Sequence, residues 1–442
     1  MRHIMGNRPR KHTWTKLIGL AALGVCAVLF FAGAFHRPLA AQEEAAPKYK
    51  VDANWPKPLP NKWKLGGVTG LAVDKDDNVW VYDRPNDLTS IEIEAELEPP
   101  IADCCTHAPA MIHIAGHDGP GYKEGDVIGY FDAQQGHGMA VDKKGFVYLG
   151  QNTVRKFDPK TGQMLMAVPH VQEQANGKPF DNDNYKATWK KGIGSAGPVA
   201  GFITLPNVPR GGRGGGVGEE AATQAALQNK AFIEKYGPTT PMIVGNIEEV
   251  RTDDDNNEIY IADSAFGGRV MVFSLDKFEF KRGWGAYGHK LSEISTAPEA
   301  HAYHPSGPMA KEFVGHLTLN FSHDGLVYAA DRGGNRIDVT DKQGNFKQEF
   351  KLAEYTGVGG STGGVMFSPD KDQKYLYISD LTNNHVWFLD RKTGKVLGTL
   401  GSMGQNAGQF FGLHMEAVDT KGDIYTGEVF YGERVQKFVP AK

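Results

Sequence analysis

Three histidines occupy equivalent places in a repeated strand–turn–strand pattern, namely His137, His316 and His414. His137 and His414 each stand five residues before the acid of a polar turn, and His316 stands six residues before Ser322 in the matching turn. Three imidazoles that converge on one point typically hold a catalytic zinc ion and leave its fourth position open for water or a substrate oxygen. The chemistry therefore depends on whether the repeat brings these three positions together.

The repeat that carries the histidines recurs six times. Each copy is an apolar strand, a tight polar turn and an alternating strand with an aromatic residue near its middle, which is typical of a β-hairpin. The copies cover residues 71–83, 139–150, 250–263, 319–331, 365–380 and 416–428. Most copies continue into a third and a fourth strand, as in 269–284, 336–350 and 385–400. Four short antiparallel strands per unit predict an all-β fold, a six-bladed β-propeller.

The ring of blades needs one strand from outside the last copy. Blade six ends after three strands, at 434–439, and residues 49–55 are predicted to supply the fourth strand and close the ring. The innermost strand of each blade then presents one residue to the channel rim, about five positions before the turn. These rim positions are Thr69, His137, Glu248, His316, Gly363 and His414. The histidines thus alternate around the axis, in blades two, four and six, and the extra residue in blade four requires a bulge.

Glu248 stands on the same rim, in blade three. Beside three histidines its carboxylate would serve as a fourth metal ligand or as a general base, and the alternative is a solvated acid at the channel mouth. Glu249 follows directly, so the sequence leaves open which of the two acids points inward.

The blade pattern resembles NHL repeats over about residues 64–440. A bacterial group of secreted NHL-type propellers shares the segments RP at 84–85, DCCTHAP at 103–109, YTGE at 425–428 and RVQKF at 434–438. Among enzymes, the chain resembles peptidyl-α-hydroxyglycine α-amidating lyase, which is a zinc propeller. The resemblance therefore implies a lyase with zinc as its cofactor.

The same resemblance implies that two arginines help to hold the substrate. Arg84 and Arg332 stand at the matching places in blades one and four, and a guanidinium offers a bidentate clamp for a carboxylate. The alternative is that each arginine pairs with a loop acid. In blade three the chain has Ala265 and Phe266 where the lyase uses a tyrosine. This departure counts against an identical reaction.

Cys104 and Cys105 are adjacent. Neighbouring Cα atoms lie about 3.8 Å apart, short of the usual disulfide span of about 4.4–6.8 Å, so a bond between them would form a strained ring. In an oxidising compartment we still expect this disulfide, because the only other cysteine, Cys26, lies in the N-terminal apolar run. The alternatives are two thiols that bind a soft metal and a purely structural pair.

The first 41 residues have the composition of a signal peptide. Basic residues precede an uncharged run at 17–35, and small residues suitable for a signal peptidase follow. The run is also long enough to span a bilayer, so an anchor retained in the inner membrane is the alternative. We expect the rest of the chain to be periplasmic or secreted, with residues 42–63 forming a linker and the ring-closing strand. Without residues 1–41 the formal charge is −10, from 42 basic and 52 acidic side chains, which argues against nucleic acid as a partner.

Two insertions interrupt the blades. Residues 170–245 contain a Gly-rich stretch at 210–218 and a helical pattern at 219–236, which is predicted to cap one face. These glycines lack the Lys-Ser/Thr of a phosphate-binding loop. Residues 286–311 contain His301 and His304, which are either an accessory metal pair or solvent-facing side chains.

Three function classes remain open. The first is a zinc-dependent lyase or hydrolase that acts on a small polar, carboxylate-bearing substrate at the channel mouth. The second is a calcium-dependent, lactonase-like hydrolase, which needs inward oxygen ligands rather than histidines. The third is a propeller that binds a ligand or a protein partner without catalysis, because this fold does not determine function.

Overall fold

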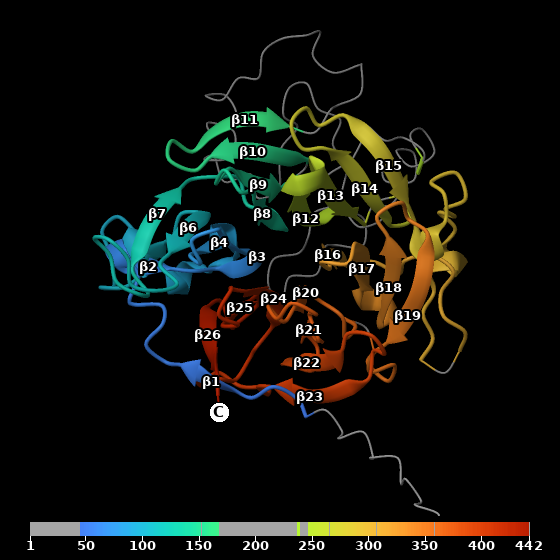
Figure 1. Cartoon of the computed structure of the whole chain (residues 1–442). Helices are drawn as coiled ribbons and strands as arrows, with labels where there is room; N and C mark the ends of the chain where they lie inside the picture. The colour runs from blue at the N-terminus through green and yellow to red at the C-terminus, as the bar shows by residue number, and fades with distance from the viewer. Residues whose placement is uncertain are drawn as a thin grey trace, which may run out of the picture. The chain divides into compact units, whose positions relative to one another are not determined.

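Polar turns between alternating strands fold the chain into six antiparallel sheets of four strands each, arranged in a ring (Figure 1). The computed structural model describes residues 45–151, 153–167, 237–238, 246–264, 266–305, 307–357 and 359–441. The predicted six-bladed β-propeller is confirmed. Within these ranges, helical residues occur only as short 3₁₀ turns, which are η1 (Pro60–Lys62), η2 (Pro85–Asp87), η3 (Ser90–Glu92), η4 (Glu94–Glu96), η6 (Asp254–Asn256), η7 (Ala286–Gly288), η8 (Pro298–His301) and η9 (Arg332–Gly334).

The first three blades follow the chain from the innermost strand outward. Blade one consists of β3 (Gly67–Val73), β4 (Val79–Arg84), β6 (Met111–Ile114) and β7 (Val127–Phe131). Blade two consists of β8 (Met139–Val141), β9 (Val147–Gly150), β10 (Val154–Asp158) and β11 (Gln163–Ala167). Blade three consists of β12 (Ile247–Asp253), β13 (Glu258–Asp263), β14 (Arg269–Ser274) and β15 (Phe280–Trp284).

The last three blades repeat this order, and the last one closes the ring. Blade four consists of β16 (Leu317–Phe321), β17 (Leu326–Asp331), β18 (Arg336–Asp341) and β19 (Phe346–Lys351). Blade five consists of β20 (Val365–Phe367), β21 (Tyr375–Asp380), β22 (His385–Asp390) and β23 (Val396–Leu400). Blade six consists of β24 (Leu413–Val418), β25 (Ile424–Glu428), β26 (Val435–Pro440) and, from the start of the described chain, β1 (Tyr49–Asp52). The pairing of β1 with β26 gives blade six its fourth, outermost strand and joins the start of the described chain to its end, as predicted.

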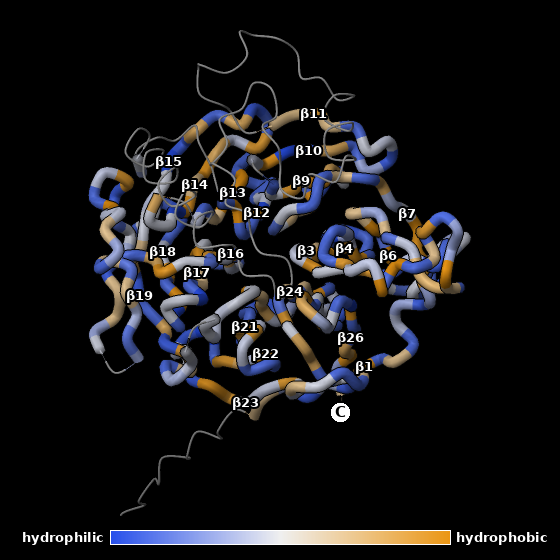
Figure 2. Tube along the Cα trace, turned by 180° about the vertical axis from the view of Figure 1, so that it is seen from behind, coloured by the Kyte–Doolittle hydropathy of each residue, from blue (hydrophilic) through white to orange (hydrophobic). Residues whose placement is uncertain are grey.

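Hydrophobic side chains fill the spaces between neighbouring blades. Six buried clusters result, and each combines residues of two adjacent blades. Each second strand contributes a buried tyrosine, namely Tyr82, Tyr148, Tyr260, Tyr328, Tyr377 and Tyr425. Hydrophobic and hydrophilic residues alternate along the strands (Figure 2). Since one blade cannot bury both of its faces alone, stability depends on the complete ring.

The two ends of the propeller differ. The innermost strands begin at one end, which we call the site face, and the antiparallel second strands return to it. The opposite face carries the short turns between first and second strands. In blade two, the Asp142 carboxylate accepts the backbone N–H groups of Lys144 and Phe146 at 2.9 Å, and Gly145 adopts a φ of +88°. This arrangement explains why the repeats combine Asp and Gly in their turns.

Several sequence predictions lie outside the described residues. They are the leader at 1–41 and nearly all of the insertion at 170–245, including its Gly-rich and helical stretches. Among the residues described, which begin at Ala45, the structure contains no helix long and apolar enough to cross a membrane.

Candidate metal centre

His137, His316 and His414 converge at the site face. Each offers one ring nitrogen, and these nitrogens lie within 4.8 Å of one another. The ring centroids are 4.8, 4.7 and 5.1 Å apart, and the Nε2 atoms of His137 and His414 are separated by 2.7 Å. The predicted convergence of blades two, four and six is therefore confirmed.

The three rings fit a metal ion. Tetrahedral zinc, with Zn–N distances of about 2.0–2.1 Å, places its ligand nitrogens about 3.3 Å apart. The observed separations, from 2.7 Å up to 4.8 Å at most, bracket this value, so small rotations of the side chains suffice. His137 Nδ1 lies 2.6 Å from the backbone oxygen of Glu248 and donates to it in the tautomer that leaves Nε2 facing the other two rings. A hydrogen bond of this kind orients a metal-ligating histidine.

His414 is held in the neutral form that binds metal. Its side chain is buried, and its Nδ1 has no hydrogen-bond partner among the residues described. Burial lowers the pKa of His414 well below its ordinary value, and the charges of His137, Arg332 and Arg84 lower it further. A neutral imidazole keeps a lone pair available for a cation.

Glu248 is the acid at the cluster. Its Oε2 lies 3.3 Å from His316 Nε2 and 3.6 Å from His137 Nε2. Its Oε1 accepts a hydrogen bond from Asn246 Nδ2 at 2.8 Å, which fixes the orientation of the carboxylate. The side chain is only 7% exposed, so it is not a solvated acid.

Glu249 has a different environment. Its carboxylate pairs with Arg251 at 3.0 Å and is fully buried. Burial raises the pKa of Glu249 to about 7, although the charge of Arg251 acts in the opposite sense. The structure thus resolves the choice that the sequence left open, since Glu248 contacts the histidines and Glu249 binds an arginine.

The backbone presents the rim residues through local irregularities of the innermost strands. In β3, β12 and β24 the pairing shifts by one residue at the rim position, which is occupied by Thr69, Glu248 and His414. Such a β-bulge re-aims a side chain. Blade four differs, because β16 pairs with β17 without any shift. The bulge predicted for blade four is therefore wrong, and His316 instead precedes the strand with a left-handed φ of +58°.

An acid at the end of the second strand holds the chain just ahead of His316. Asp331 accepts the backbone N–H groups of Val314 and Gly315 at 3.0 Å and pairs with the buried Arg336 at 3.0 Å. Equivalent acids in blades one, three and six also bind the entering backbone, and these are Asp83, Asp263 and Glu428. Sequence reasoning missed this role, although five of the six copies end in an acid.

The two arginines lie close enough to the cluster for their charges to lower the pKa of His414. Arg84 ends β4 and pairs with Asp87 at 3.1 Å, with both side chains about a quarter exposed. This is the pairing with a loop acid that the sequence left as an alternative. Arg332 begins η9 in blade four. Substrate binding by Arg84 and Arg332 stays a prediction.

No protein-family model matches the chain, and no curated protein matches its sequence. Hydrazine synthase of Kuenenia stuttgartiensis aligns with a TM-score of 0.41 and 12% identity, over 84% of this chain and 76% of that one. A protein of unknown function from Bacteroides thetaiotaomicron aligns with a TM-score of 0.45 and 14% identity, over 90% and 76%.

Cys104 and Cys105 are joined by a disulfide across a cis peptide bond, with their Cα atoms 3.1 Å apart. The pair lies in the long β4–β6 connection at the site face, directly ahead of β5 (Thr106–His107). This short strand pairs with β2 (Trp63–Lys64) and ties the connection to the chain that precedes blade one. Because the two sulfurs are bonded to each other, they are not the free thiols that would bind a soft metal.

Two other features do not belong to the centre. Both ring nitrogens of His301 contact backbone oxygens, those of Phe313 at 2.6 Å and Ser295 at 2.7 Å, so His301 does not form the accessory metal pair with His304.

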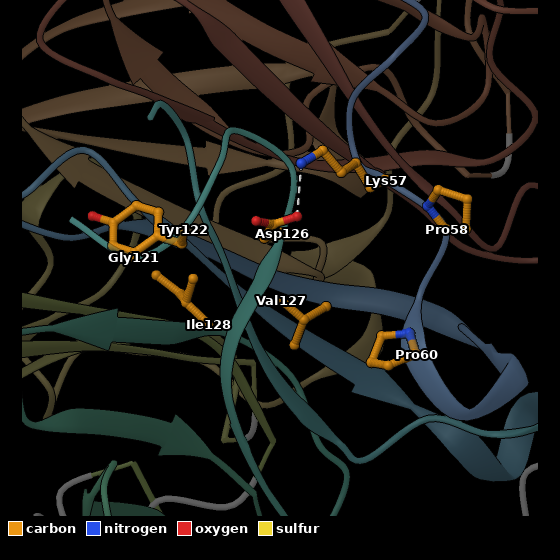
Figure 3. A pocket seen from close by; sticks show the side chains of 8 residues that line it. All are labelled: Lys57, Pro58, Pro60, Gly121, Tyr122, Asp126, Val127 and Ile128. Carbon is orange, nitrogen blue, oxygen red and sulfur yellow. Dashed lines mark hydrogen bonds and ion pairs between the residues drawn. The ribbon is translucent and has the colours of Figure 1, made fainter. Parts of the chain in front are cut away.

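A surface pocket of about 600 Å³ lies beside β7 of blade one (Figure 3). An ion pair between Lys57 and Asp126 borders this pocket, and none of the rim residues lines it.

Proposed function

We propose that the protein is an extracytoplasmic propeller enzyme of the NHL-repeat kind, a zinc-dependent lyase or hydrolase similar to peptidyl-α-hydroxyglycine α-amidating lyase. The convergence of His137, His316 and His414 from alternate blades carries this proposal. Three imidazoles with an open fourth position are typical of catalytic zinc. Calcium prefers oxygen ligands, so the nitrogen-rich cluster favours the zinc enzyme over the lactonase-like alternative.

The residues around the cluster fit acid–base chemistry. Zinc bound by the three histidines would supply a Lewis acid that polarises a substrate oxygen. Glu248 then acts as the general base, because its Oε2 faces the histidines and its Oε1 is held by Asn246. The burial of Glu248 excludes bulk water from this carboxylate and strengthens its interactions with a bound substrate.

Arg84 and Arg332 indicate the chemical class of the substrate. Both guanidinium groups act on His414 through their charge, so an anionic group bound between them and the cluster is favoured. We infer a small polar substrate with a carboxylate, which Arg84 receives by exchanging its contact with Asp87 for the substrate. The resulting clamp orients the reacting atom toward the histidines and Glu248.

An oxidising compartment is part of the proposal. The leader at 1–41 directs the chain out of the cytoplasm, either released by cleavage or anchored in the inner membrane by residues 17–35. The disulfide between Cys104 and Cys105 supports a periplasmic or secreted location, because such bonds persist where the environment is oxidising.

Metal analysis of the purified full-length protein tests the proposal. We expect the wild-type protein to hold stoichiometric zinc after dialysis, and His137→Ala, His316→Ala and His414→Ala each to lose it, because two imidazoles bind too weakly. His117→Ala is the matched control, since His117 lies in a turn of the opposite face, where its ring contacts the backbone oxygens of Asp76 and Asp118.

The contrary outcomes are equally clear. A wild-type protein that neither carries zinc nor takes it up from solution would contradict the metal centre and leave the non-catalytic binding propeller as the remaining class. Zinc retained in all three histidine variants would place the ion elsewhere. Calcium retained with calcium-dependent lactone hydrolysis would support the lactonase-like alternative instead.

A further inference from the structure

Exposed hydrophobic side chains are distributed unevenly over the described residues. Five of them stand singly in the outermost strands β7, β11, β15, β19 and β23, and the turns of the opposite face contain none. The others lie in connections at the site face. Single exposed side chains are ordinary, whereas a group of them on one surface marks an interaction site.

Three of these side chains share the β4–β6 connection of blade one. They are Ile91, Leu97 and Ile101, which are 74%, 40% and 65% exposed. The backbone N–H groups of Leu97 and Ile101 both donate to the carbonyl oxygen of Glu94, at 3.5 and 3.3 Å, so the chain folds back and brings these two residues together. We call residues 91–103 the acidic ridge.

The ridge is held firmly on the propeller. Glu92 caps η3 by accepting the backbone N–H and the hydroxyl of Thr89 at 2.9 and 2.7 Å. Lys64 bridges Glu92, at 3.4 Å, and Glu433 of the β25–β26 connection in blade six, at 3.1 Å. Glu96 binds the ring of His107 at 2.7 Å. The apolar side chains are thus presented in a fixed arrangement, which lowers the entropy cost of binding.

The charge of the ridge is of one sign. The whole connection at 85–110 contains six acidic residues and no Lys or Arg. Glu98 and Asp103 are exposed and form no ion pair with the residues described. Such a surface repels the anionic headgroups of a membrane and a second copy of this acidic chain. It complements a segment that carries positive charge.

We propose that the acidic ridge is a docking surface for a partner protein segment that combines basic and apolar residues. Its apolar side chains pack on Ile91, Leu97 and Ile101, and its Lys or Arg side chains pair with Glu98 and Asp103. This inference goes beyond the proposed enzyme, because it uses none of the residues of the metal centre.

A labelled synthetic peptide of alternating Lys and Leu pairs serves as the probe, with fluorescence anisotropy as the readout on the full-length protein. We expect it to bind at low salt, and the same peptide with Glu in place of Lys not to bind. The double variants Ile91→Ser/Ile101→Ser and Glu98→Lys/Asp103→Lys should each weaken binding by about tenfold or more, since each removes about 1.4 kcal/mol or more.

Matched variants control for general effects of charge and hydrophobicity. Glu279→Lys/Glu299→Lys makes the same change of charge at exposed acids of blade three and the connection that follows it, and Tyr130→Ser/Leu165→Ser removes exposed apolar side chains from outermost strands. Both should bind the probe as the wild type does, and thermal unfolding should show that all variants are folded.

Four outcomes would overturn the docking surface. The first is no binding of the Lys-Leu peptide, and the second is equal binding of the Glu-Leu peptide. The third is equal weakening in the control variants. The fourth is ridge-dependent binding to phosphatidylglycerol vesicles, or ridge-dependent dimerisation in light scattering, without peptide binding, since these would identify a lipid surface or a second copy as the occupant. Zinc content is unaffected by the ridge variants, so this test is separate from that of the metal centre.

Discussion

Alternate blades use the same rim position for different purposes. Blades two, four and six place a histidine there, and their rings meet. In blade one, Thr69 Oγ1 donates to the backbone oxygen of Gly136 at 2.7 Å and so binds the segment that enters blade two. In blade five, Gly363 allows the backbone oxygen of Ser379 to approach closely, because a Cβ atom at this position would lie only 2.7 Å from that oxygen. Glu248 of blade three contacts the histidines themselves.

This difference teaches how a repeat acquires a site. The repeated hydrogen bonds fix where the rim positions lie, and the residue type at each one decides whether it binds, supports or makes room. We therefore expect substitutions that disturb the histidine-bearing blades to affect metal binding, and equivalent changes in blades one and five to leave the metal bound.

The acids that end the second strands give the largest contrast in stability. Asp331→Ala removes the nearest acid of the buried Arg336, at 3.0 Å, while Glu349 at 3.7 Å and Asp338 at 3.9 Å remain. The cost is therefore about 3 kcal/mol, the lower end of the range for a broken buried ion pair. The substitution also releases the backbone ahead of His316. We expect it to lower the free energy of unfolding by this amount and to reduce zinc affinity. Asp83→Ala, the equivalent change in blade one, loses the hydrogen bond to Gly66 N and should keep the zinc. Equal zinc loss in both variants would break the comparison.

The adjacent acids of blade three separate function from stability. The pKa of Glu249 rises from 4.5 to about 7 on folding, so the folded state binds the proton more tightly. Stability should therefore fall as pH rises from about 4.5 to 7 and stay lowered above that, a change on the order of 3 kcal/mol. Glu249→Gln should flatten the pH dependence of the free energy of unfolding, measured by chemical denaturation, and should leave zinc bound. A pH dependence unchanged from that of the wild type would show that Glu249 does not cause it.

Arg84 of blade one and Arg332 of blade four should control the binding of carboxylates. Acetate serves as the carboxylate probe in the cobalt-loaded protein, where its binding at the metal centre changes the visible absorption. Arg84→Gln and Arg332→Gln should each weaken acetate binding about ten- to hundredfold, because each removes a charged hydrogen bond worth about 1.5–3 kcal/mol. Arg282→Gln, which alters an arginine paired with Glu258 in blade three, should have no effect. An acetate affinity unchanged in Arg84→Gln and Arg332→Gln would show that neither arginine binds the carboxylate.

Two glycines in the connections before and after blade four, Gly315 and Gly357, give the smallest and most local contrast. A Cβ atom at Gly315 or at Gly357 would meet no other atom within 4 Å, but only Gly315 has a positive φ, of +133°. Gly315→Ala should therefore destabilise the protein by about 1–2 kcal/mol through backbone strain alone, and should weaken zinc binding through His316. Gly357→Ala should be nearly neutral in thermal unfolding, and an equal effect of both substitutions would argue against strain as the cause.

Much of the fold could be predicted because its signal is repeated. Apolar alternation around six turns determines strands and blades, and the missing strand of blade six requires β1. Counting back five residues from the first polar residue of the turn, an Asp in four blades and Ser368 in blade five, located five rim positions, since that interval is set by the hairpin. The position of His316 was predicted correctly, but the bulge expected beside it was wrong, because a left-handed residue takes its place. Backbone dihedral angles of single residues leave little trace in a repeat pattern.

The support of the site was harder to infer. The separation of Glu248 from Glu249 depends on a one-residue shift in pairing that the letters EE do not reveal. The hydrogen bonds of Asp331 join segments that are adjacent only in the folded blade. The backbone groups that such acids bind can be identified only from the tertiary structure. The recurrence of an acid at the end of most copies was nevertheless a visible signal of a shared role.

Anomalous diffraction at the zinc edge, from crystals of the zinc-loaded protein, tests the central claim most directly. The account predicts one strong peak at the site face, about 2.0–2.1 Å from a ring nitrogen of each of His137, His316 and His414. A peak bonded to fewer than three of these histidines, or located only elsewhere on the propeller, would contradict it.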